Sequence, residues 1–149
     1  MNRFIPPKLV LAVLVGLVLV IFCFECAVQA QSEKGRVPAI RITGVDSKKV
    51  TGRVDYVNYD THKVVLYICL SKTGGQWWVK PYSNDPKSDI GGRGKWKVNY
   101  RTAPTDKNAK AFIAFLVSEK LKKADIPTVL YGGVPFLPGA KAVSNVKTR

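Results

Sequence analysis

Residues 63–70 read Lys63-Val64-Val65-Leu66-Tyr67-Ile68-Cys69-Leu70, and every position after the lysine is apolar. A short apolar run that is rich in β-branched residues predicts a strand that is buried on both faces or lies at the centre of a sheet. Residues 109–117 contain a second run of this kind, Phe112-Ile113-Ala114-Phe115-Leu116. We expect these two strands to form the centres of two sheets.

The segments around these two strands alternate apolar and polar residues, as half-buried strands do. Clusters of Gly, Pro, Asn and Asp separate them, and these residues favour turns. The pattern predicts an all-β fold, an antiparallel β-sandwich of about seven strands within residues 37–149. One helical turn is expected within residues 118–124, and a long ordered loop or extended edge within 126–140. The five further strands are expected at 37–43, 50–57, 76–80, 95–100 and 142–146.

The first 30 residues have the parts of a secretory signal peptide. Arg3 and Lys8 make the start basic, residues 9–24 form an apolar leader helix, and Ala30 ends a cleavage site. Sixteen helical residues span about 24 Å, less than a hydrocarbon core of about 30 Å. We therefore favour cleavage after Ala30 over an uncleaved membrane anchor formed by residues 4–28. In both cases residues 31–36 are a linker, and the domain is exported to the periplasm, the cell surface or the extracellular space.

The chain contains 24 Lys and Arg residues and 10 Asp and Glu residues, which gives a net charge of +14. Such a field favours anionic partners such as acidic polysaccharides, envelope phosphates and acidic proteins, although solubility alone also accounts for it. Cys69 is the one cysteine that follows the leader. We therefore expect no internal disulfide, and a buried thiol that acts as a small hydrophobic group.

The reactive side chains argue against an enzyme. His62 is the one histidine, and no nucleophile-elbow pattern is present, so a catalytic triad lacks its parts. A glycosidase needs two carboxylates at a fixed separation, but the glutamates beyond the leader are Glu33 and Glu119 alone. No His and Cys cluster offers a zinc site, and no nucleic-acid-binding signature is present. We expect no catalytic residue, no metal, no cofactor and no nucleic-acid partner.

Residues 76–86 place two adjacent tryptophans beside short polar groups. Neighbouring residues of a strand point to opposite faces, so both tryptophans cannot be core. Val79 favours the core, and Trp77 shares its face. Trp78 and Lys80 then face solvent. A flat ring beside amide and carboxylate groups suits the apolar faces and hydroxyls of a sugar. The candidate ligand-binding residues are Trp78, Lys80, Tyr82, Asn84, Asp85 and Trp77.

The alternative is that both tryptophans are covered. One would lie in the sandwich core, and the other would lie beneath the loop at residues 126–138. That loop has aromatic residues of its own, Tyr131 and Phe136.

Several segments follow one another in a characteristic order: Lys49-Val50-Thr51-Gly52-Arg53-Val54, Lys63-Val64-Val65-Leu66-Tyr67-Ile68, Trp77-Trp78-Val79-Lys80-Pro81, Gly94-Lys95-Trp96 and Ala114-Phe115-Leu116-Val117. Together they resemble small immunoglobulin-like modules of exported bacterial surface proteins and of polysaccharide-acting enzymes. The resemblance covers roughly residues 40–118, and the Trp-Trp-x-Lys-Pro segment is its distinctive part. It implies an immunoglobulin-like β-sandwich that binds or spaces and does not catalyse.

Two functions follow from these observations. The first is an exported, non-catalytic module that binds a glycan or another anionic envelope polymer. The second is a structural or accessory subunit of a cell-envelope complex, held by an uncleaved leader helix. Its exposed aromatic residues and the loop at residues 126–140 would then contact a protein partner. In either case the membrane is contacted only through an uncleaved leader.

Overall fold

Residues 35–71, 75–81 and 84–149 are described by the computed structural model of this chain, and the fold is that of the unit Val37–Arg149. The predicted leader, its cleavage after Ala30 and most of the linker at 31–36 lie outside the described residues. Within the described ranges, no helix is both long enough and apolar enough to cross a membrane.

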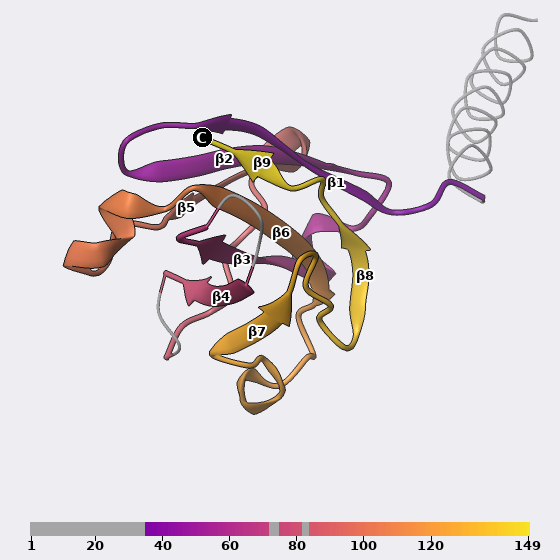
Figure 1. The fold of residues 1–149 in the computed structure, drawn as a ribbon. Helices are drawn as coiled ribbons and strands as arrows, with labels where there is room; N and C mark the ends of the chain where they lie inside the picture. The colour runs from indigo at the N-terminus through magenta and orange to yellow at the C-terminus, as the bar shows by residue number, and fades with distance from the viewer. Residues whose placement is uncertain (1–34, 72–74, 82–83) are drawn as a thin grey trace, which may run out of the picture. The chain divides into compact units, whose positions relative to one another are not determined.

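The strands form two antiparallel sheets, which Figure 1 shows with β1 and β2 on one side of β6 and β3. The three-stranded sheet has the order β1-β2-β5, and the larger sheet has the order β7-β4-β3-β6-β8, with β9 also pairing to β6. The prediction of an all-β antiparallel fold is confirmed. The strands are β1 (Ala39–Val45), β2 (Lys49–Asp55), β3 (His62–Cys69), β4 (Gly75–Lys80), β5 (Lys95–Asn99), β6 (Ala111–Ser118), β7 (Val129–Gly132), β8 (Ala140–Val143) and β9 (Lys147–Thr148).

Each predicted strand has a counterpart within a few residues, and β9 is an additional strand that the pattern did not predict. β7 lies inside the segment expected as a loop or extended edge, and it pairs with β4 as an edge strand. The helical turn expected near 118–124 is a short 3-10 turn at Lys123–Asp125.

β3 and β6 are neighbours at the centre of one sheet, paired from His62 with Ser118 to Cys69 with Ala111. The prediction that they form the centres of two different sheets is therefore wrong. Both strands are apolar on successive residues because both faces of this sheet are covered. β2, at the centre of the other sheet, is buried only at alternate positions, since its outer face meets solvent.

The two faces of the larger sheet belong to two separate cores. The inter-sheet core lies between the sheets and includes Val54 and Trp96 from one sheet and Leu66 and Phe112 from the other. The loop-covered core lies on the opposite face, beneath the connection from β6 to β8 at residues 119–139. Its buried members are Val65, Tyr67, Cys69, Trp77, Val79, Ala111, Ile113, Phe115, Val117, Ile126, Leu130 and Leu137.

Gly52 makes room for the largest side chain that the three-stranded sheet sends into the inter-sheet core. It lies opposite Trp96 in the β2–β5 pair. A Cβ atom on Gly52 would overlap the indole ring of Trp96 and the carbonyl oxygen of Arg41. The glycine of the Thr-Gly-Arg segment is therefore required by packing.

Candidate functional site

Strand β4 presents its two tryptophans to opposite faces of the larger sheet. Trp77 is 0% exposed and Trp78 is 40% exposed. The predicted orientation is confirmed, because the alternation along β4 continues without a bulge from Trp77 to Lys80. The alternative in which both rings are covered is wrong for Trp78.

Trp77 is covered by the loop and does not lie in the inter-sheet core, where the sequence placed its ring. It packs in the loop-covered core with Leu130 and Leu137. Its Nε1 donates a 3.0 Å hydrogen bond to the carbonyl oxygen of Gly132. The expected core face of β4 is therefore correct, but its cover is the 119–139 connection.

Lys80 shares the face of Trp78 but is only 8% exposed, so the prediction that it faces solvent is wrong. Its Nζ lies 2.7 Å from Oδ2 of Asp106 and 3.2 Å from Oγ1 of Thr102. The connection after β5 folds over this end of β4 and supplies the buried counter-charge. A lysine can be buried here because its ammonium group is paired and hydrogen-bonded.

Asp106 is the centre of a buried polar network. Besides the Lys80 ammonium, the backbone amides of Thr102 and Ala103 donate to Oδ2 at 2.8 and 2.7 Å. Burial by itself raises the pKa of Asp106, but the hydrogen bonds from Lys80 and the two amides outweigh burial and lower the pKa below its ordinary value. The carboxylate is thus ionised at neutral pH and fixes the 101–106 loop against β4.

A groove of about 510 Å³ opens beside the exposed face of Trp78, and we call it the Trp78 groove. It exists because the three-stranded sheet does not cover β4. Leu70 and Pro81 add apolar surface beside the indole ring. Gln76 and Thr128 bring an amide and a hydroxyl to the same groove. The groove thus combines one flat aromatic ring with hydrogen-bonding groups, and its base is held by the Lys80–Asp106 pair.

The other predicted site residues do not line the Trp78 groove. Asn84 is exposed in a turn, and Asp85 lines a different hollow. Tyr82 lies outside the described residues. After the groove the chain crosses from one sheet to the other, since Ser88 bridges to Val64 of β3 and Ile90 bridges to Trp96 of β5. We call residues 84–91 the crossing segment.

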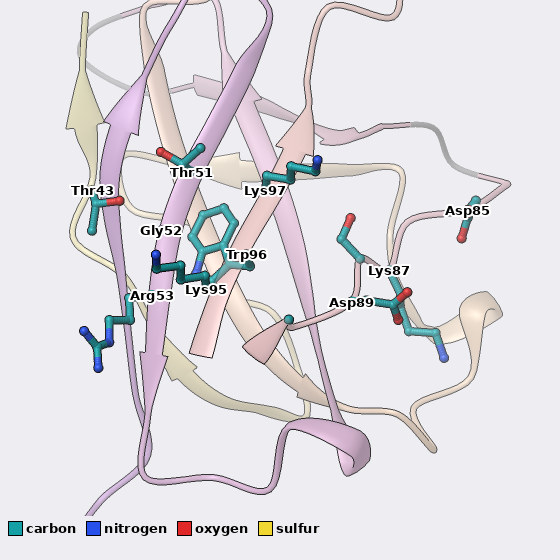
Figure 2. A pocket seen from close by; sticks show the side chains of 12 residues that line it. Thr43, Thr51, Gly52, Arg53, Asp85, Lys87, Asp89, Lys95, Trp96 and Lys97 are labelled. Carbon is teal, nitrogen blue, oxygen red and sulfur yellow. The ribbon is translucent and has the colours of Figure 1, made fainter. Parts of the chain in front are cut away.

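The second hollow has a volume of about 940 Å³ and lies between the crossing segment and the outer side of the three-stranded sheet. Figure 2 shows Lys95, Trp96 and Lys97 of β5 among the residues that line it, with Asp85 and Asp89 on the side of the crossing segment. Sequence reasoning did not identify this site. Its signal was the alternation of Lys95-Trp96-Lys97-Val98, which places both lysines on the outer face.

The one histidine, His62, contacts neighbouring residues of the turn that leads into β3. His62 Nδ1 lies 3.0 Å from the carbonyl oxygen of Asn58 and 3.0 Å from the hydroxyl of Thr61, where the turn leads into β3. Across the described part of the chain, no three His, Cys, Asp or Glu side chains gather where they could hold a metal ion. Cys69 is a buried free thiol.

Comparison with known proteins finds no family model, no curated protein and no solved structure that matches this chain.

Proposed function

We propose that this chain is an exported, non-catalytic binding module with an immunoglobulin-like β-sandwich, and that it binds a glycan in the Trp78 groove. The observation that carries this proposal is the half-exposed indole ring of Trp78 within a groove that also offers hydrogen-bonding groups. Sugar rings present apolar C–H faces that stack on an indole and hydroxyls that pair with amide and hydroxyl groups.

The rigidity of the groove supports binding. Trp78 is held on β4 between Ile68 of β3 and Val129 of β7. The buried Lys80–Asp106 pair fixes the loop that forms the opposite wall. A site whose parts are already in place loses less conformational entropy when a ligand binds.

The strand register also places a second aromatic ring on the face of Trp78, beside the groove. Tyr131 lies opposite Gln76 in the β4–β7 pair, so it shares the face of Trp78. It is 71% exposed. A second aromatic ring on the same face would suit a ligand longer than one sugar unit, so the proposed ligand is an oligosaccharide.

The test is a glycan array with the wild-type domain, followed by titration of any glycan that binds. Trp78→Ala should weaken binding at least about tenfold, because truncating a central aromatic anchor commonly costs about 2 kcal/mol or more. Phe136→Ala is the matched control, since Phe136 is 77% exposed and does not line the groove. Equal binding by wild type and Trp78→Ala, with unchanged thermal unfolding, would contradict the proposal, and so would the absence of any bound glycan.

One observation favours the second function, an accessory subunit of a cell-envelope complex. Tyr131, Val134 and Phe136 are large hydrophobic side chains of the 119–139 connection that are each more than 70% exposed. Exposed apolar clusters mark protein interfaces. In that case Phe136→Ala would abolish capture of a protein partner from solubilised envelope while Trp78→Ala would not. The two variants therefore separate the two functions.

A further inference from the structure

The side chains of β1, β2 and β5 that point away from the inter-sheet core form what we call the basic face. Five exposed cations lie on it, namely Arg41, Lys49, Arg53, Lys95 and Lys97. Asp55 is the one acidic side chain that these strands add. The face is therefore a concentration of positive charge on an otherwise ordinary antiparallel sheet.

Three of these cations lie directly opposite one another. The register pairs Arg41 with Arg53, and Arg53 with Lys95, in one row across all three strands. Neighbouring strands are about 4.8 Å apart, and like charges opposite each other destabilise a sheet. Solubility alone does not require this row, because the same charges scattered over the surface would serve it without the repulsion.

Asp55 pairs with two of the three cations of the row and leaves Lys95 without a counter-charge in the described part of the chain. Its carboxylate lies 3.2 Å from Nη2 of Arg41 and 3.2 Å from Nε of Arg53. Lys95 and Lys97 form no ion pair within the residues that the structure describes. They lie two residues apart on β5, a separation of about 7 Å along a strand. Two free cations are thus presented side by side to an external anion.

The larger hollow lies beside these two lysines and has a mixed lining. Thr51 and Ser88 supply hydroxyls, and Asp85 supplies a carboxylate across from the lysines, as Figure 2 shows for the labelled residues. Asp89 also lines the hollow, but its carboxylate is paired with Nζ of Lys63 at 2.6 Å. Lysines suit the carboxylate or sulfate groups of a ligand. Threonine, serine and aspartate side chains suit its hydroxyls.

This combination of lysines, hydroxyls and carboxylate favours an acidic sugar polymer over a nucleic acid as the ligand. A dense phosphate backbone would meet the carboxylate of Asp85 as well as the lysines, whereas the charge of Asp89 is paired with Lys63. Single-stranded nucleic acid is held mainly by aromatic rings that stack on its bases. Trp96 of β5 lines the hollow but is only 3% exposed, so its ring is not open to a stacking base. A polymer that carries both acid groups and hydroxyls uses both sets of groups in the hollow.

We propose that the basic face and its hollow bind an acidic polysaccharide, one with carboxylate or sulfate groups along a chain of hydroxylated rings. This second site is separate from the Trp78 groove and stands whether or not the groove binds a glycan. Lys95 and Lys97 supply the positive charge that contacts the acid groups.

The test measures binding to polygalacturonate and to chondroitin sulfate, with neutral dextran and double-stranded DNA as comparisons. The variant is Lys95→Gln with Lys97→Gln. The matched control is Lys122→Gln with Lys123→Gln, which removes the same charge from two exposed lysines on the 119–139 connection. At about 0.05 M salt the first variant should bind the acidic polysaccharides about tenfold more weakly, with a smaller salt dependence, while the control changes little.

Three outcomes would overturn the proposal: no binding to either acidic polysaccharide, equal loss in both double variants, or tighter binding to DNA than to the polysaccharides. Equal loss would mean that the net charge of the domain attracts the polymer without a site. Trp78→Ala should leave this binding unchanged, so failure here is distinct from failure of the Trp78 groove. Since Lys95→Gln removes a like-charge contact, the variant should unfold at an equal or higher temperature than wild type, which keeps a folding defect from imitating the result.

Discussion

The two buried faces of β3 and β6 come from the same strands but are covered by different kinds of structure. The inter-sheet face packs on a second antiparallel sheet whose backbone is held by its own ladder. The loop-covered face packs beneath residues 119–139, whose buried side chains are Ile126, Leu130 and Leu137, and of these Leu137 is 0% exposed. One cover is a regular sheet. The other is irregular on both sides of β7, which pairs with β4 at the edge of the larger sheet, and it buries a few large side chains.

Aromatic residues of the larger sheet hold the irregular cover in place. The hydroxyl of Tyr67 donates a 2.6 Å hydrogen bond to the carbonyl oxygen of Pro127. Nε1 of Trp77 donates to the carbonyl oxygen of Gly132. The loop therefore depends on side chains of the sheet for part of its backbone hydrogen bonding, whereas the three-stranded sheet does not. The inter-sheet core should consequently be the stiffer of the two.

The first prediction compares two phenylalanines of β6 that occupy opposite faces. Phe112 packs edge-to-face on Tyr100 in the inter-sheet core, and Phe115 packs edge-to-face on Tyr67 in the loop-covered core. Each change to alanine should cost about 3–5 kcal/mol of unfolding free energy. Phe112→Ala should lie near the upper value, because a stiff cover cannot collapse into the cavity. Phe115→Ala should lie near the lower value.

Urea unfolding of both variants measures the difference. Equal costs would mean that the 119–139 connection is as rigid as a sheet. A larger cost for Phe115→Ala would reverse the comparison between the two faces.

The sequence predicted the regular part of the fold better than the irregular part. Alternation located the strands of the three-stranded sheet, because one of its faces is solvated. Residues 63–70 and 109–117 were correctly predicted as strands buried on both faces. Their assignment to two sheets failed, because a run without alternation indicates burial but not which strand it pairs with.

The candidate site was predicted in part for the same reason. Parity along β4 located the exposed Trp78, since neighbouring side chains alternate. It could not show that Asp106, 26 residues further along, reaches Lys80 and buries it. Nor could it show that Asp85 is carried to another hollow by the crossing segment. Both errors concern loops that fold back onto a strand distant in the sequence. The local residue pattern of a loop does not show which strand the loop will contact.

The second prediction concerns the end of the inter-sheet face that the three-stranded sheet leaves uncovered. Asp106→Asn should cost about 3 kcal/mol at neutral pH, because it leaves the ammonium group of Lys80 buried without its counter-charge. The pKa of Asp106 is lower in the folded chain than its ordinary value of 3.8. Its contribution to stability is therefore complete above that value and is lost as the pH falls through the lower folded pKa.

Unfolding free energies of wild type and Asp106→Asn between about pH 2 and 6 test this sign. The difference between the two proteins should be constant near pH 6 and should shrink on acidification below about pH 4. Asp46, whose pKa is also lowered, chiefly by backbone hydrogen bonds from Lys48 and Lys49, is present in both proteins and cancels. A difference that grows in acid would contradict the assigned role of Asp106.

The third prediction tests how tightly the regular cover is packed. Gly52→Ala should cost about 2 kcal/mol, the range expected for overpacking a core, because the added methyl group meets both the Trp96 ring and the Arg41 carbonyl oxygen. Gly92→Ala is the control, since a Cβ there meets nothing within 4 Å. Thermal unfolding should separate the two variants, and similar midpoints would show that the inter-sheet core yields more easily than we infer.

The fourth prediction has the smallest expected effect. It concerns the hydrogen bond from the Tyr67 hydroxyl to Pro127 in the 119–139 connection. Tyr67→Phe keeps the ring in contact with Phe115 and removes only the hydrogen bond to Pro127, so it should cost about 1 kcal/mol. Burial raises the pKa of Tyr67, so the hydroxyl remains protonated and able to donate over the accessible pH range. The loss should be local, because the backbone ladder of the three-stranded sheet does not depend on this bond. Native-state hydrogen exchange should therefore accelerate along residues 119–132 and stay unchanged in β2 and β5. Uniform acceleration in both regions would mean that the 119–139 connection opens only when the whole domain unfolds. The connection and the three-stranded sheet would then have the same free energy of opening.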